Sequence, residues 1–373
     1  MKILLTGATG IIGSTLATHL LNVKHPDNSP AFDIKFIVRG DSIEHSVLKL
    51  NNAILPHLSA HTETNQNLII NRIIPENVIC GDMSTLDFLN DSKLEQTDVV
   101  VNLAASTSFN PNDEQIKLNT DRVVDFAKGM LIINPHLQKF IHTSAAYACG
   151  DQFPPYSIIS NDWDTTNPTT DFAVYEKVKR QSENAIKAVP NLPFIIARPS
   201  IVVGHTQLGC SISSSLYWVL QAINQLEVFP CNKDCLIDVI AVDQVAKMFT
   251  ALILRGEVRK SYNLSAYKSA NTLFEIVESI GGNKVTQYKQ VSTEVLKEMV
   301  QQHRGTDLYR VYKAVVTYSA FINSSYTFDN TSILQLCNET KTTPLLEYSN
   351  ICLKTNEGKS LYELALPDFK ELY

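Results

Sequence analysis

The 373-residue chain has a formal charge of −6, and 44% of its residues are hydrophobic. This length and composition allow a large core in one big domain or two unequal ones, which excludes an intrinsically disordered protein. Acidic and basic residues are spread along the chain, so it offers no basic stripe to nucleic acid or to an anionic lipid surface, and we expect neither partner.

The sequence also argues against a membrane span and a metal site. No uninterrupted apolar run is long enough to cross a bilayer, and the apolar start Met1–Leu5 is too short for a secretory signal. Seven scattered cysteines, an odd number, indicate free thiols in a reducing cytoplasm. Cys231 and Cys235 have no second cysteine or histidine pair at ligand spacing, so we predict two ordinary thiols and no metal.

Apolar, β-rich runs alternate with longer helical patterns over about the first two hundred residues. This order is typical of a parallel sheet that helices cover on both faces. Proline, glycine or capping residues bound each helical pattern. Strands are predicted at 2–6, 33–39, 77–80, 98–104, 138–143 and 193–198, and helices at 11–22, 42–58, 112–133 and 171–189.

The pattern changes in the later part of the chain. Residues of about 211–228 are apolar and aromatic at helical spacing, and after residue 264 short helical patterns replace strands. Neither a repeat nor a flexible linker separates the two parts. We therefore predict a doubly wound α/β domain of the Rossmann type at 1–205 and about 236–264, with a smaller, mostly helical substrate lobe at about 206–235 and 265–373.

The most specific motif is TGATGIIG at Thr6–Gly13, directly after the first strand. Gly7 permits the tight turn, Gly10 removes a side chain where the backbone approaches a pyrophosphate, and Gly13 lets the next helix pack on the sheet. That helix points its N-terminal amides at the anion. A chance glycine turn is the alternative, but strand, turn and helix stand in the order that dinucleotide binding needs. The predicted cofactor contacts here are Thr6, Gly7, Thr9, Gly10, Ile11 and Gly13.

The end of the second strand indicates which dinucleotide binds. An acidic residue there would bind the adenosine ribose of NAD, whereas Arg39 accommodates the 2′-phosphate of NADP. We therefore predict NADPH rather than NAD, with a merely solvated arginine as the alternative and Asp41 nearby as a counterargument. Ligands bind open α/β sheets at the carboxyl ends of the strands. Further cofactor contacts are predicted there at Asp82, Met83, Asn102, Ala104, Ala105, Pro199 and Ile201.

Tyr175 and Lys179 are the predicted centre of the chemistry, because positions i and i+4 share one face of a helix. We expect the ammonium to lower the pKa of the phenol toward a useful general acid/base value. Ser144, at the end of the fifth strand, can donate to a substrate carbonyl oxygen during hydride addition. These three residues are the predicted catalytic set, and both Tyr175 and Lys179 would also contact the cofactor. A second pair at this spacing, Tyr309 and Lys313, lacks a preceding serine strand end and is interpreted as a surface helix face.

Together these motifs resemble the extended short-chain dehydrogenase/reductase family over roughly residues 1–265. The resemblance implies a nicotinamide cofactor and a supporting role for Asn119, which would bridge helix backbone and active-site water. Many members carry the catalytic hydroxyl one residue later, where this chain has Ala145, so Ser144 or Thr143 would have to supply it. The other matching segments are Ala197-Arg198-Pro199, Val203-Gly204 and Leu236–Asp243.

Within that family, the chain looks more like the fatty acyl-CoA reductase and thioester reductase branch. The features are Ile37-Val38-Arg39 before a long helix, the segment His142–Tyr147, and Tyr326–Asn330 before a leucine-containing helix. The likeness implies that NADPH reduces an acyl thioester, carried by CoA or an acyl carrier protein, to an aldehyde, and that a second hydride could give an alcohol. The residues of Leu216–Leu220 and Phe229 would be walls of an acyl tunnel or simply core residues of the lobe.

Two other functions stay open. The protein could be an NAD(P)-dependent dehydrogenase, epimerase or dehydratase that acts on a sugar nucleotide or secondary alcohol, which tightly retained NAD would favour. It could also be a non-catalytic, NADP-sensing regulatory protein on the same scaffold, although Tyr175 and Lys179 disfavour that reading. His142 is interpreted as a core histidine rather than as part of the site.

Overall fold

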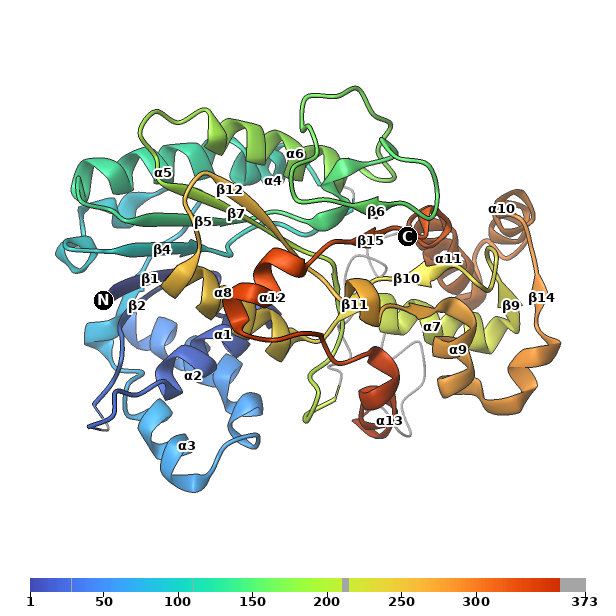
Figure 1. Ribbon diagram of the computed structural model, residues 1–373, viewed down its shortest axis with the longest axis horizontal. Coiled ribbons are helices and arrows are strands. Elements are labelled where there is room, and N and C mark those ends of the chain that lie inside the picture. The colour runs from blue at the N-terminus through green and yellow to red at the C-terminus, as the bar shows by residue number, and fades with distance from the viewer. Residues whose placement is uncertain (28, 110, 210–214, 356–373) are drawn as a thin grey trace.

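The computed structural model describes residues 1–355, except 28, 110 and 210–214. A seven-stranded parallel sheet forms its centre, in the order β12-β7-β5-β4-β1-β2-β3 (Figure 1). The chain reverses its direction across the sheet between β1 and β4, and such switch points are where open α/β sheets bind ligands. The strands are β1 (Lys2–Thr6), β2 (Asp33–Val38), β3 (Val78–Cys80), β4 (Val99–Asn102), β5 (Lys139–Thr143), β7 (Phe194–Pro199) and β12 (Lys260–Leu264).

Helices cover both faces of the sheet, as the sequence predicted. Successive strand residues point to opposite faces, so Ile3 and Leu5 join one buried cluster and Leu4 joins another. In Figure 1, α4, α5 and α6 lie above the sheet, and α1, α2 and α8 lie below it. Burial on both faces explains why these strands are nearly continuous apolar runs. The helices are α1 (Ile11–Asn22), α2 (Ile43–Leu58), α3 (Glu63–Ile70), α4 (Asp113–Asn119), α5 (Asp121–Ile133), α6 (Val174–Lys187) and α8 (Val242–Arg255).

All six predicted strands are confirmed, and the differences lie elsewhere. The helix predicted at 112–133 divides at Thr120, whose φ of −111° and ψ of −77° interrupt the helix between α4 and α5. The helix predicted at 171–189 begins only at Val174, because Ala173 is extended. Three elements of the sheet domain were not predicted: α3, which buries only Ile69, α8, and β12, an edge strand with few apolar residues.

The helical lobe has a hydrophobic core of its own, at the right of Figure 1. Its helices are α7 (Ser215–Leu226), α9 (Leu273–Gly281), α10 (Thr293–Gln302), α11 (Asp307–Ser324) and α13 (Leu345–Thr355). Helix α12 (Thr331–Cys337) falls in the range expected for the lobe but packs on α8, with Ile333 in the core beneath the sheet. The exact domain boundaries stay a prediction. Residues 210–214 and 356–373, which were assigned to the lobe, lie outside the described residues.

Short strand pairs connect the lobe to the sheet domain. Strand β6 (Ile158–Ile159) pairs in parallel with β15 (Thr327–Phe328), and a mainly aromatic cluster around Tyr147 and Phe321 fills the space beside them. No helix of the described residues is long and apolar enough to cross a membrane. The remaining strands are β8 (Ile201–Val202), β9 (Val228–Phe229), β10 (Leu236–Ile237), β11 (Val239–Ile240), β13 (Asn271–Thr272) and β14 (Lys289–Gln290).

Candidate active site

A cavity of about 470 Å³ lies at the carboxyl edge of the sheet. It brings together the glycine turn after β1, the end of β5, and the inner face of α6, which are far apart in the sequence. All three predicted catalytic residues, Ser144, Tyr175 and Lys179, line it. The predicted cofactor residues on its wall are Gly7, Gly10, Ile11, Gly13, Ala105, Pro199 and Ile201. We name it the reaction cavity.

The glycine turn has the shape that a pyrophosphate needs. Gly7 has a φ of +69°, and a Cβ atom on Gly13 would lie 2.0 Å from the Gly7 carbonyl oxygen, so neither position accepts a side chain. Helix α1 begins after Gly10 with no side-chain cap and no acidic residue in its first turn. Its first amides therefore lack a side-chain acceptor, and the positive end of the helix dipole is not neutralised. These residues fit an anionic dinucleotide.

The side chains of Thr6 and Asn102 hold this turn against β4. Thr6 Oγ1 donates to Asn102 Oδ1 at 2.7 Å and accepts from the amides of Leu103 and Ala104 at 3.2 and 3.1 Å. Both side chains are buried, and neither lines the reaction cavity. They were predicted as cofactor contacts, and in this structure they fix the position of the backbone that a cofactor would approach.

Five further predicted cofactor residues lie outside the wall of the reaction cavity: Thr9, Arg39, Asp82, Met83 and Ala104. The Arg39 side chain is 80% exposed beyond the end of β2, and its Nη1 atom lies 3.9 Å from Asp82 Oδ2. Thr9 is exposed, and Met83 is buried in the core beside β3. A guanidinium that is accessible to solvent can receive a phosphate, so the assignment of Arg39 to the 2′-phosphate stays a prediction.

Helix α6 places the Lys179 ammonium 5.7 Å from the centre of the Tyr175 ring. The ammonium donates to the Thr143 carbonyl oxygen at 3.1 Å. Burial lowers the pKa of Lys179 to about 8, against the attraction of Glu183. Because that value lies above 7, the side chain is still mostly cationic at neutral pH.

The expected lowering of the Tyr175 pKa is wrong for this structure. Burial raises the pKa of the phenol, and the neighbouring Glu176 carboxylate raises it further. Desolvation disfavours the phenolate, and the Lys179 ammonium, which donates to the Thr143 carbonyl, is not among the groups that shift this pKa. In this environment Tyr175 holds its proton and is equipped to act as a general acid.

Three consecutive residues at the end of β5 line the cavity: Thr143, Ser144 and Ala145. Thr143 Oγ1 is buried and makes no hydrogen bond to the described residues. The Ser144 hydroxyl is likewise buried and makes no hydrogen bond to the described residues. The hydroxyl predicted for the substrate carbonyl can therefore come from Thr143 or Ser144, since Ala145 supplies only a methyl group.

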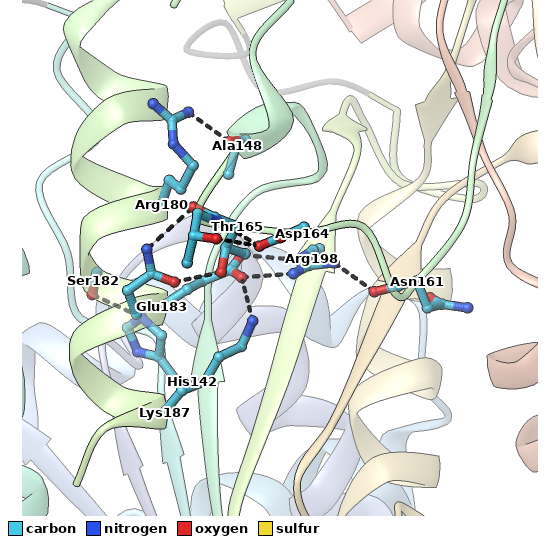
Figure 2. A network of polar contacts seen from close by, with 12 residues as sticks. His142, Ala148, Asn161, Asp164, Thr165, Arg180, Ser182, Glu183, Lys187 and Arg198 are labelled. Atoms are coloured by element: carbon cyan, nitrogen blue, oxygen red, sulfur yellow. Dashed lines mark hydrogen bonds and ion pairs between the residues drawn. The ribbon is translucent and has the colours of Figure 1, made fainter. Parts of the chain in front are cut away.

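A buried polar network fixes α6 on the sheet (Figure 2). Arg198 of β7 donates to the two carboxylate oxygens of Glu183 at 2.9 and 2.7 Å, and both side chains are fully buried. The Arg198 guanidinium also lies 4.2 Å from the centre of the Trp163 ring. Because Glu183 is one turn beyond Lys179 on the same helix face, this paired contact sets the rotation at which α6 faces the cavity.

Arg180 and Ser182 add further contacts of the same helix, and Figure 2 shows those with Ala148 and His142. Arg180 forms a paired ion contact with Asp171 at 2.6 and 2.9 Å and donates to the Ala148 carbonyl at 2.9 Å. His142 Nε2 lies 2.9 Å from Ser182 Oγ, and burial lowers the pKa of this histidine to about 3. His142 is thus a neutral, bonded core residue, as the sequence analysis interpreted it.

Asn119 supports the site through the backbone. Its Oδ1 accepts from the Ser106 amide and its Nδ2 donates to the Ser106 carbonyl, each at 2.8 Å. Each polar atom of the side chain thus makes one bond to Ser106, and the predicted bridge to active-site water stays a prediction. These two bonds fix the segment that leads from β4 to Phe109.

An aromatic wall of the reaction cavity was not predicted. The Phe109 ring lies 5.9 Å from Tyr175, 5.1 Å from Tyr318 and 5.6 Å from Phe321, measured between ring centres. Phe109 follows the carboxyl end of β4, a position that the strand-end rule could have indicated. Tyr318 and Phe321 come from the middle of α11, where no local motif marks them.

The predicted tunnel walls belong to the lobe core instead. The described side chains of Leu216–Leu220 and that of Phe229 are buried in the lobe cluster, and none lines the reaction cavity. Cys231 and Cys235 are free, buried thiols in the same cluster. Among the described residues, no group of three or more potential ligands could hold a metal ion.

The fold and the site define an NAD(P)-dependent oxidoreductase of the extended short-chain dehydrogenase/reductase type. The family model described as male sterility protein, an NAD-binding family, matches residues 5–249. This match spans more than half of the chain, and the protein belongs to that family. No curated protein is similar enough in sequence to match it.

Several solved structures share the fold. The terminal R domain from the myxalamid PKS-NRPS biosynthetic pathway is 16% identical with a TM-score of 0.73, over 95% of this chain and 90% of that chain. A thiolation-reductase di-domain from an archaeal non-ribosomal peptide synthetase is 17% identical with a TM-score of 0.71, over 95% and 75%. UDP-glucuronic acid 4-epimerase from Bacillus cereus in complex with NAD is 17% identical with a TM-score of 0.60, over 96% and 99%.

Proposed function

We propose that this protein is an NADPH-dependent reductase of acyl thioesters carried by CoA or an acyl carrier protein. The observation that carries the proposal is the composition of the reaction cavity, where the glycine turn, Tyr175 and Lys179 meet an aromatic wall of Phe109, Tyr318 and Phe321. Such a wall suits an apolar acyl group. Membership of the male sterility protein family and the likeness to a thiolation-reductase di-domain support the same assignment.

A bound nicotinamide cofactor would supply the hydride, and the protein must handle the charge that develops on the carbonyl oxygen. Tyr175, which burial keeps protonated, donates a proton to that oxygen. Lys179 holds the end of β5 through Thr143 and provides positive charge beside the phenol. The Thr143 or Ser144 hydroxyl donates to the same oxygen. Loss of the thiol then gives an aldehyde, which a second hydride reduces to an alcohol.

The preference for NADPH rests on Arg39. Its guanidinium is exposed beyond β2, the strand end at which an arginine accommodates the 2′-phosphate of NADP, and its Nη1 atom lies 3.9 Å from Asp82 Oδ2. Asp82 is then available to the adenine amino group, as the sequence analysis predicted. The ratio of kcat/KM for NADPH to that for NADH measures this preference, and Arg39→Ala is expected to lower the ratio at least tenfold.

The direct test is oxidation of the reduced cofactor, followed at 340 nm with acyl-CoA thioesters of graded chain length and with an acylated carrier protein. Thioester-dependent oxidation, with aldehyde or alcohol identified by mass spectrometry, is the expected result. Absence of turnover with every thioester, in a protein that binds NADPH, would overturn the proposal.

A second candidate function is supported by one comparison. The epimerase from Bacillus cereus covers nearly the same length with NAD bound, and an NAD-dependent epimerase, dehydrogenase or dehydratase would use the same tyrosine and lysine. That function predicts NAD retained through purification and turnover of sugar nucleotides or secondary alcohols in place of thioesters. The aromatic wall of the reaction cavity disfavours a sugar, whose hydroxyls need polar partners.

A further inference from the structure

A second cavity, of about 540 Å³, adjoins the reaction cavity at Phe109, which lines both. We name it the outer cavity. Helices α6 and α11 also take part in both. On α6, Val174 and Lys177 line the outer cavity, whereas Tyr175 and Lys179 line the reaction cavity. Neighbouring helix positions point about 100° apart, so one helix separates two spaces with different chemistry.

The outer cavity has an excess of positive charge. Lys177 of α6 and Lys297 of α10 line it with exposed side chains, and within the described part of the chain neither ammonium has a hydrogen bond or an ion pair. Glu294, three residues before Lys297 on α10, is the carboxylate that interacts with Lys297 electrostatically. Asp171 is the one acidic residue of the described lining, and Arg180 already binds both of its carboxylate oxygens at 2.6 and 2.9 Å. Two ammonium groups from different helices thus remain available to an anion.

The rest of the lining is apolar or weakly polar. Phe172, Val174 and Val316 contribute to it, and Phe109 closes the side toward Tyr175. The hydroxyl of Thr317 donates to a carbonyl of its own helix, so it adds little polarity. A ligand that suits this lining carries negative charge at one end and a long, mostly uncharged chain that reaches toward Phe109.

We propose that the outer cavity binds the phosphate-bearing pantetheine arm of the substrate, with Lys177 and Lys297 at the phosphate and the thioester directed past Phe109 to Tyr175. This inference rests on the proposed function. A phosphate joined to pantetheine is common to CoA and to the prosthetic group of an acyl carrier protein. The site would therefore recognise the carrier of the acyl group, whereas the reaction cavity recognises the acyl group itself.

The test compares thioesters that carry the same acyl group with and without a phosphate. Lys177→Glu and Lys297→Glu place like charges beside the phosphate, and each is expected to raise KM for acyl-CoA and for acyl-4′-phosphopantetheine about tenfold or more. KM for the acyl N-acetylcysteamine thioester, which has no phosphate, should change less than twofold. Lys289→Glu is the matched control, because Lys289 is an exposed lobe lysine outside both cavities.

Each outcome separates this inference from the proposed function. Turnover of thioesters with equal KM values in wild type and both variants overturns the phosphate site and leaves the reductase intact. A rise in KM confined to acyl-CoA also overturns it, because the lysines would then bind the nucleotide phosphates. No turnover with any thioester instead overturns the proposed function. Wild-type kcat/KM values for acyl-CoA and for an acylated carrier protein identify the source of the arm. The carrier with the higher value is the natural one.

Discussion

The chain contains two Tyr-x-x-x-Lys pairs with the same internal geometry and different surroundings. In α6, the Lys179 ammonium lies 5.7 Å from the centre of the Tyr175 ring, and in α11 the same distance separates Lys313 from Tyr309. Only the α6 pair lines the reaction cavity, where Lys179 is buried against the Thr143 carbonyl. The α11 pair is half-buried, so the predicted surface face is only partly exposed. The i, i+4 spacing brings the tyrosine and lysine of each pair together, and the position of the helix decides whether the pair lines the reaction cavity.

The two helices also differ in how they are fixed. Helix α6 is tied to β7 by the buried contact of Glu183 with Arg198. Helix α11 packs through apolar side chains and presents Tyr318 and Phe321 to the reaction cavity from its other part. A polar anchor fixes rotation more sharply than apolar packing, because hydrogen bonds depend on direction. The helix that carries the proposed proton donor is thus fixed by a buried, directional contact.

The strongest test of this comparison removes the phenolic hydroxyl of each pair. Tyr175→Phe is expected to lower kcat/KM for thioester reduction about 10³-fold, because the substrate oxygen loses its proton donor. Tyr309→Phe, the matched control, should stay within twofold of wild type. Steady-state rates with acyl-CoA measure both, and equal losses in the two variants would show that the α6 pair has no special role.

Removal of each ammonium is expected to have the next largest effect. Lys179→Met should lower kcat/KM about 10²-fold, whereas Lys313→Met should have little effect. In wild type, kcat/KM should also fall above about pH 8, where Lys179 loses its proton. A pH profile that is the same for wild type and Lys179→Met would contradict this assignment.

The same pKa predicts a trend in stability. Below about pH 8, Lys179 is charged in both the folded and unfolded states, so its burial destabilises the folded state in full. Between pH 8 and about 10.4, the folded state has released the proton that the unfolded state still binds, so this penalty shrinks as the pH rises. Urea denaturation should therefore show wild type gaining stability relative to Lys179→Met over that range.

The anchor of α6 gives a further prediction. Arg198→Met leaves the Glu183 carboxylate buried without its main partner, and we expect the free energy of unfolding to fall by about 3–5 kcal/mol. Lys313→Met on α11 should change it by less than about 0.5 kcal/mol. Equilibrium urea denaturation measures both. A double variant, Glu183→Leu with Arg198→Met, should recover part of the loss because it removes the unpaired charge, and failure to recover would point to a packing defect instead.

The smallest expected effect is a gain. Ala145 lines the reaction cavity with a methyl group where many family members carry a hydroxyl. Ala145→Ser would add a donor for the developing negative charge, and we expect kcat to rise up to about tenfold. A decrease would indicate that Thr143 or Ser144 already fills this role and that the added hydroxyl interferes.

Much of this arrangement could be predicted from local sequence. TGATGIIG gave the turn because glycine alone tolerates the φ of +69° at Gly7 and the contact at Gly13. The strands were found because two-sided burial leaves apolar runs, and β12 was missed because an edge strand lacks one. Tyr318 and Phe321 could not be predicted, since their place on the cavity wall depends on ring contacts with Phe109 and Tyr147, which lie more than a hundred residues earlier in the chain.

By itself, the sequence determined the features that depend on neighbouring residues: strand and helix periods, the glycine turn, and the common spacing of both Tyr-x-x-x-Lys pairs. The tertiary structure decided which pair meets the reaction cavity, that Asn119 binds Ser106, and that the pKa of Tyr175 is raised. The reason is physical. Backbone geometry extends over a few residues, whereas desolvation and directional contacts depend on every group that folding brings close, whatever its position in the chain.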